Sequence, residues 1–71
     1  MNATNVNTGS GGKVPPLFDH VNAYFALKGM STDEAEIFYY HYESMGWESE
    51  NGTPFSNWKT LADDWIWNLL N

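Results

Sequence analysis

The chain has 71 residues and no cysteine, so it forms at most one domain and holds neither a disulfide nor a thiolate metal site. The chain has three lysines and nine acidic residues. Its net charge of −6 disfavours contact with phosphate backbones and with anionic lipid. Because no apolar run approaches the ~18 residues of a membrane span and the N-terminus lacks the apolar region of a signal peptide, we expect a cytoplasmic protein without a membrane partner.

The first 13 residues, MNATNVNTGSGGK, are dominated by Asn, Thr, Gly and Ser. Such a segment cannot bury enough apolar surface to offset the conformational entropy that ordering removes. We therefore expect residues 1–13 to be a flexible tail or linker and residues 14–71 to form the domain. A linker at this end also suggests that the chain is the end of a longer protein, or a fragment of one.

Two segments with a helical period follow the prolines at the domain edge. The first covers residues 17–28 and ends at Gly29, the residue type that most easily adopts the left-handed position after a helix. The second covers residues 32–45, and Ser31 and Glu34 form a capping box at its start. The side chains expected to face the core from these two helices are Leu17, Phe18, Val21, Tyr24, Phe25, Ala35, Phe38, Tyr39, Tyr42 and Met45.

Residues 48–56, ESENGTPFS, contain the pair Asn51-Gly52 and predict a turn or a short hairpin. A third helix is predicted over residues 58–69, with Asn57 as its N-cap. The side chains expected to face the core from this helix are Trp58, Leu61, Ala62, Trp65 and Leu69. Short connections between helices favour antiparallel neighbours, so the sequence predicts an all-α, three-helix bundle. Four Trp, four Tyr and four Phe give it an aromatic core.

A pattern of aromatic, glycine and cap positions extends over residues 16–66. It consists of Pro16, Phe18-x-x-Val21-x-x-Tyr24, Glu34-Ala35-x-x-Phe38-x-x-x-Tyr42-x-x-x-Gly46-Trp47 and Asn57-Trp58-Lys59-x-x-x-x-x-Trp65. This pattern resembles a small module at the C-terminal end of phage replication initiators and replisome organisers. It is also similar to the C-terminal single-stranded-DNA-binding domain of the primosomal protein that helps load the replicative helicase. The resemblance implies a helical bundle behind a flexible linker, in contact with single-stranded DNA or with the helicase-loading machinery.

The chain departs from this family pattern in its charge. The phage modules typically read Asp-Trp-Lys, then small apolar residues, then an Arg before the second Trp. Lys59 matches, but Asp63 stands at the Arg position and Asp64 follows it. Residues 14–71 hold two lysines and nine acids, a net charge of −7. A domain that holds phosphates by counterion release needs the opposite sign.

Several apolar side chains fall off the expected core-facing stripes. At about 100° per residue, Trp67 lies about 180° around the third helix from Trp58, and Ile66 and Leu70 lie between them. Tyr40 points away from the core-facing stripe of the second helix, and we expect it to be a further binding residue. We expect a second apolar surface of Ile66, Trp67 and Leu70 beside Lys59, which serves a partner, self-association into a homo-oligomer, or base stacking. The alternative is that these are scattered surface aromatics or rings covered by the tail.

The sequence offers no arrangement that predicts catalysis. His20 and His41 are lone histidines on polar helix faces, and the adjacent Asp63 and Asp64 diverge on a helix and cannot face one site. We expect neither an enzyme, nor a metal site, nor a cofactor. Two functional hypotheses remain beside an inert domain. One is a DNA-replication accessory module, and the other is an acidic interaction module, such as a phage or mobile-element effector that binds a basic partner protein.

Overall fold

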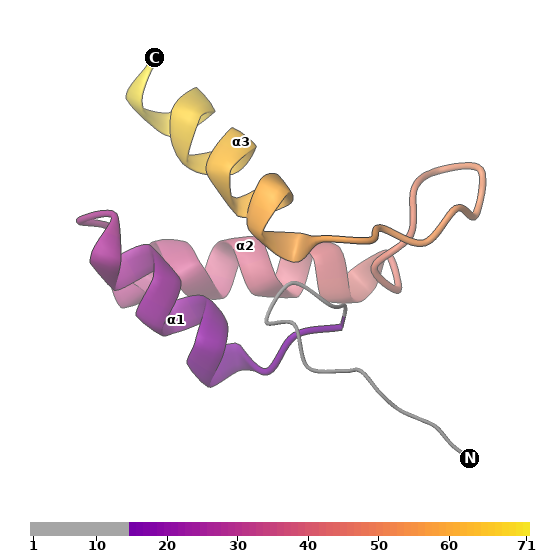
Figure 1. Cartoon of the computed structure of the whole chain (residues 1–71), viewed down its shortest axis with the longest axis horizontal. Coiled ribbons are helices and arrows are strands. Elements are labelled where there is room, and N and C mark those ends of the chain that lie inside the picture. The colour runs from indigo at the N-terminus through magenta and orange to yellow at the C-terminus, as the bar shows by residue number, and fades with distance from the viewer. Residues whose placement is uncertain (1–14) are drawn as a thin grey trace.

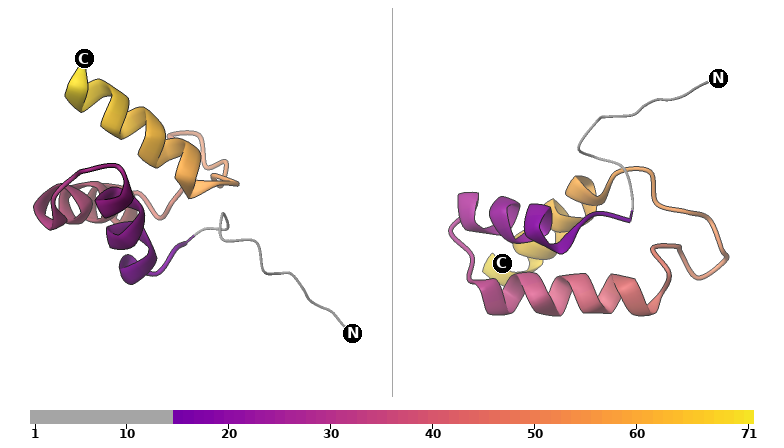
Figure 2. Two further views of the ribbon diagram at one scale, coloured as in Figure 1. Left: turned by 60° about the vertical axis from the view of Figure 1, so that its left-hand side comes forward. Right: turned by 90° about the horizontal axis from the view of Figure 1, so that it is seen from below.

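The computed structural model describes residues 15–71, which form the three α-helices α1 (Phe18–Leu27), α2 (Thr32–Ser44) and α3 (Trp58–Leu70) (Figure 1). Helices α1 and α2 lie side by side and run in opposite directions, and α3 crosses them (Figure 2). The predicted all-α three-helix bundle is confirmed, with each helix end within one residue of its expected position. The predicted tail, residues 1–13, lies outside the described residues. None of the three helices is long and apolar enough to cross a membrane.

The N-cap residues and the glycine that bound the helices are the predicted ones. The Ser31 hydroxyl oxygen accepts the backbone N–H of Glu34 at 3.2 Å, and the Asn57 side-chain oxygen accepts the backbone N–H of Lys59 at 3.0 Å. Each bond satisfies a helix N–H that has no partner within its own helix. Gly29 follows α1 with φ +79, a conformation that a side chain would strain.

The chain leaves α2 through a Schellman turn that sends a tryptophan into the core. The N–H of Gly46 donates to the carbonyl of Glu43, and the N–H of Trp47 donates to the carbonyl of Tyr42, both at 3.0 Å. Trp47 itself has φ +58, which residues other than glycine seldom adopt. Its indole N–H donates to the Glu43 carboxylate at 2.7 Å, and its ring is buried. Burial and this hydrogen bond offset the backbone strain.

The segment between α2 and α3 is the predicted turn. The N–H of Gly52 donates to the carbonyl of Ser49 at 2.9 Å, and Glu48 and Pro54 form one antiparallel bridge. The described residues contain no longer strand than this single bridge, so the alternative of a short hairpin reduces to a tight turn. The turn returns the chain to the start of α3.

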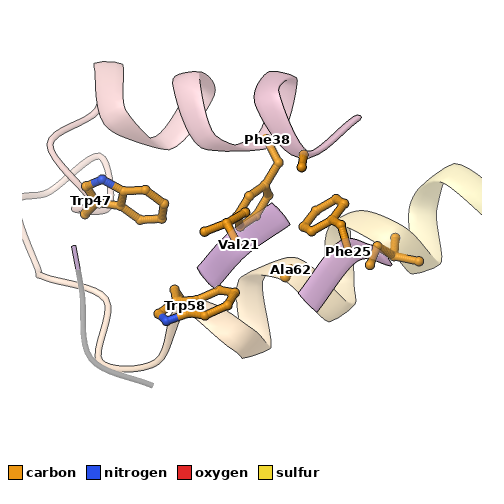
Figure 3. Close-up of a cluster of buried hydrophobic side chains, with 8 residues drawn as sticks. Val21, Phe25, Phe38, Trp47, Trp58 and Ala62 are labelled. Carbon is orange, nitrogen blue, oxygen red and sulfur yellow. The ribbon is translucent and has the colours of Figure 1, made fainter. Parts of the chain in front are cut away.

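The core is a cluster of eight buried hydrophobic side chains, four of them aromatic (Figure 3). The Phe38 ring lies 5.1 Å from the ring centroids of Phe25 and Tyr42. It lies 5.5 Å from the Trp65 ring, so side chains of all three helices meet at this one residue. The eight buried hydrophobic residues are Val21, Phe25, Ala35, Phe38, Trp47, Trp58, Ala62 and Ile66.

Three residues expected in the core lie outside it, and one expected on the surface lies within it. Met45, the C-cap of α2, is only partly buried and does not pack against the buried cluster. Leu17 is 65% exposed because it is the N-cap of α1 and precedes the buried stripe. On α3, Leu69 is 45% exposed and Ile66 only 7% exposed. The buried row of α3 runs Trp58, Ala62, Ile66, one residue every four, so α3 is rotated away from the predicted stripe. The C-terminal end of α3 also diverges from α2 (Figure 1), and Leu69 therefore lacks cover.

Candidate functional site

Two open hollows lie in the described surface between α1 and α3. The first is lined by His20, Ala23, Tyr24, Leu27, Trp58 and Lys59. The second is lined by Lys28, Asp63, Ile66, Trp67 and Leu70, and these five residues are named the Trp67 surface below. Lys28 is the C-cap of α1 and α3 supplies the other four, so the surface exists only when the two helices pack.

Tyr24 and Asp63 separate the two hollows and tie α1 to α3. The Tyr24 hydroxyl donates to the Asp63 carboxylate at 2.7 Å, and the Lys28 ammonium lies 3.8 Å from the same carboxylate. The ammonium groups of Lys28 and Lys59 lie 5.1 Å and 5.6 Å from the centre of the Tyr24 ring. Both lysines of the described residues therefore converge on one tyrosine. Asp63, which stands where the resemblance implies an Arg, connects two helices.

The Tyr24 hydroxyl acts as a hydrogen-bond donor throughout the physiological pH range. Its pKa is raised to about 12, first because the O–H donates to the Asp63 carboxylate. Partial burial and the Asp63 charge add to the shift, because loss of the proton would place two anions side by side. A hydroxyl held in this way serves structure, and it has no tendency to act as a base or a nucleophile.

Trp67 and Leu70 project from the bundle as the sequence predicts. Trp67 is 65% exposed and Leu70 is 69% exposed. Ile66 lines the same hollow as Trp67 and Leu70, as predicted, but it is largely buried because it belongs to the buried row of α3. Only its remaining accessible edge lines the hollow. The Trp67 surface thus joins the core through Ile66 and meets solvent through Trp67 and Leu70.

Lys59 and Tyr40 lie apart from this surface. Lys59 lines the first hollow, eight residues from Trp67 and so about 12 Å away along the helix axis at 1.5 Å per residue. Tyr40 is 63% exposed on α2, lines neither hollow, and packs edge-on against Tyr39 with the ring centroids 5.8 Å apart. The expected neighbourhood of Trp67 and Lys59 is therefore wrong, and Tyr40 is a separate surface aromatic.

Lys28 and Asp63 belong to the site, although sequence reasoning did not place them there. Asp63 departs from the family pattern, but its partners are distant in the sequence: Lys28 precedes it by 35 positions and Tyr24 by 39. The periodicity of one helix does not indicate which of its polar residues meets another helix. An acid on α3 and a lysine near the end of α1 were the only available signals.

The charge around the Trp67 surface is negative. Residues 15–71 hold two lysines and nine acids, and Lys28–Asp63 is the only ion pair within 4.0 Å among them. Asp63 and Asp64 precede Trp67 by four and three positions and flank it on the helix surface, Asp63 at the hollow and Asp64 on the side toward Tyr42 of α2. Asp64 also contributes to a raised pKa of Tyr42, after the larger effect of burial. The surface is therefore apolar in its centre and anionic at its rim.

No protein-family model matches this chain, and neither a curated protein nor a solved structure is similar enough to it to count as a match. Within residues 15–71, no three His, Asp or Glu side chains are grouped so that they could hold a metal ion. What the described surface offers chemically is an exposed indole, an apolar hollow and a few charges. These groups are suited to binding.

Proposed function

We propose that the chain is a non-enzymatic accessory module of DNA replication that acts by binding, through the Trp67 surface, to the helicase-loading machinery or to single-stranded DNA. The observation that carries the proposal is the exposed indole of Trp67 beside Leu70 and above an apolar hollow. Exposed tryptophan beside an apolar hollow is typical of binding hot spots. The assignment to replication is supported by the pattern of residues 16–66, which resembles the replication modules.

A protein partner fits the surface better than DNA does. Bases could stack on Trp67, for about 1–3 kcal/mol each, with Lys28 and Lys59 near the backbone. Two lysines would release counterions from at most two phosphates, so the logarithm of the DNA affinity would fall with a slope of only about −1.4 against the logarithm of salt concentration. The net charge of −7 over the described residues opposes even this small gain. We therefore place the helicase-loading proteins first and single-stranded DNA second.

The test compares binding of the wild-type chain, Trp67→Ala and Tyr40→Ala to three purified ligands. These ligands are the replicative helicase, its loader, and fluorescently labelled oligo-dT at low salt. Tyr40 is the matched control because it is an aromatic of nearly equal exposure on another helix. We expect Trp67→Ala to weaken binding to the helicase or loader at least about tenfold, and Tyr40→Ala to change it less than about twofold. Equal binding by all three chains, or no binding to any ligand, would refute the proposal.

The charge favours a second candidate, an effector module of a phage or mobile element that binds a basic protein outside replication. Such a module is steered to its partner by the long-range field of its uncompensated acids. This candidate predicts no binding to the helicase, the loader or oligo-dT in the same experiment. It predicts instead a basic partner whose association rate falls as salt is added.

A further inference from the structure

The hollow of the Trp67 surface is suited to binding an apolar side chain of a ligand. Three of its five lining residues are Ile66, Trp67 and Leu70, and the fourth, Lys28, turns its ammonium toward Tyr24 and Asp63. The aliphatic stem of such a lysine adds apolar surface. The polar groups of Lys28 and Asp63 already pair with each other. The two charges at the hollow therefore largely balance each other, and the apolar side chains dominate what the hollow can bind.

The charges around the hollow determine whether it favours a cationic or an anionic ligand. The Asp63 charge is balanced by Lys28 at 3.8 Å, whereas no cation of the described residues lies within 4.0 Å of Asp64. The seven acids other than Asp63 and Asp64 are likewise without an ion pair among the described residues. A phosphate or carboxylate would approach this face against the field of the whole domain. A lysine or arginine would approach it with that field.

The other hollow limits where a basic occupant can lie. Lys59 lines it, and its ammonium lies over the rings of Tyr24 and Trp58. A cationic segment is therefore repelled from the N-terminal half of α3. It is favoured at the C-terminal half, where Asp64, Trp67 and Leu70 are exposed.

We propose that the Trp67 surface seats a basic amphipathic helix of a partner protein. One apolar side chain of that helix enters the hollow between Trp67 and Leu70, and its lysines or arginines lie near Asp64. This inference rests on the proposed function only in that the chain acts by binding, and it adds the chemical class of the partner.

The experiment uses the full chain labelled with ¹⁵N and three probes. The first probe is a helical peptide with leucines on one face and lysines elsewhere, the second is the same peptide with every Lys replaced by Glu, and the third is oligo-dT. Each tryptophan gives one indole N–H signal, which single Trp→Phe variants assign. The Lys peptide should shift the Trp67 signal and leave the Trp58 signal in place, because the Trp58 ring is buried.

Four variants make the experiment decisive. Trp67→Ala should weaken binding of the Lys peptide at least about tenfold, and Tyr40→Ala less than about twofold. Asp64→Asn should weaken the Lys peptide about two- to threefold and strengthen any binding of oligo-dT, because removal of one anion has opposite effects on the two ligands. Glu48→Gln removes the same charge from the turn before α3, and it should change both affinities less than Asp64→Asn does.

Each contrary result has a separate meaning. If the Glu peptide or oligo-dT binds more tightly than the Lys peptide at Trp67, the proposal is overturned in favour of an anionic ligand. Binding of the Lys peptide that survives Trp67→Ala overturns it as general attraction to an acidic chain. A dimer by sedimentation equilibrium that Trp67→Ala dissociates overturns it in favour of a second copy as the occupant. No shift of the Trp67 signal overturns it too, and the proposed function then stands or falls on the helicase and loader measurements alone.

Discussion

Ile66 and Trp67 are neighbours on α3 with opposite surroundings, and their truncation should separate stability from binding. Ile66 is 7% exposed, and Ile66→Ala removes three buried carbons worth about 0.8 kcal/mol each. With the cavity that remains, we expect a loss of about 2–4 kcal/mol in the free energy of unfolding. Trp67 is 65% exposed, and Ala has the higher helix propensity, so Trp67→Ala should change the free energy of unfolding by less than about 0.5 kcal/mol.

Urea denaturation of the full chain, followed by far-ultraviolet circular dichroism, measures both changes. A free energy of unfolding of about 0.05–0.15 kcal/mol per residue is typical, so that of the described domain is expected to be a few kcal/mol. The Ile66→Ala variant should therefore be barely folded. Ile66→Val is the graded control, with an expected loss of about 0.5–1.5 kcal/mol. A loss below about 1 kcal/mol for Ile66→Ala, or above about 1 kcal/mol for Trp67→Ala, would show that the rotation of α3 is wrong.

Three further predictions follow from the core, a helix cap and the link between α1 and α3. Phe38→Ala removes the ring on which all three helices meet, and we expect a loss of about 3–5 kcal/mol, seen as an unfolded circular-dichroism spectrum at 25 °C. Ser31→Ala removes the cap of α2 and should lower the free energy of unfolding by about 1 kcal/mol in urea, whereas Ser31→Asp should retain most of it. Asp63→Asn should lower the pKa of Tyr24 from about 12 toward 10, as ultraviolet titration of the tyrosinate measures. Because the folded pKa of Tyr24 is the raised one, wild-type stability should be intact below pH 10 and fall as the pH rises toward 12, and this fall should be smaller in Asp63→Asn.

The helix bounds could be predicted because their signals are local. Ser31 and Asn57 cap the helices that follow them, and Gly29 follows α1 in the left-handed conformation. Each of these choices depends on a few neighbouring residues, so no knowledge of the tertiary structure was needed.

The rotation of α3 could not be predicted, since its apolar residues form two overlapping rows. Trp58 belongs to both rows, one of which continues through Leu61 and Trp65 and the other through Ala62 and Ile66. The structure buries the second row most deeply, and Trp65 packs at its edge. Which row is buried depends on how α3 packs against α1 and α2. The periodicity of α3 alone does not predict that packing.

The candidate site was predicted in part for the same reason. Trp67 and Leu70 lie on the exposed side under either rotation, so their place was predictable. Lys28 reaches the surface only through the packing of α1 on α3, and Lys59 is separated from Trp67 by two turns of one helix. Contacts between helices have no local sequence signal. The sequence therefore predicted Lys59 beside the apolar patch, where the structure places Lys28.

Hydrogen exchange of the four indole N–H groups in the full native chain tests most directly that one tryptophan is left outside an otherwise closed aromatic core. The Trp47 and Trp58 rings are buried, and the Trp65 indole nitrogen is buried as well. The structure predicts a single indole signal that exchanges at the rate of an unprotected indole, and this signal is absent from Trp67→Phe. Two or more unprotected indoles, or a fast signal that persists in Trp67→Phe, would contradict the account.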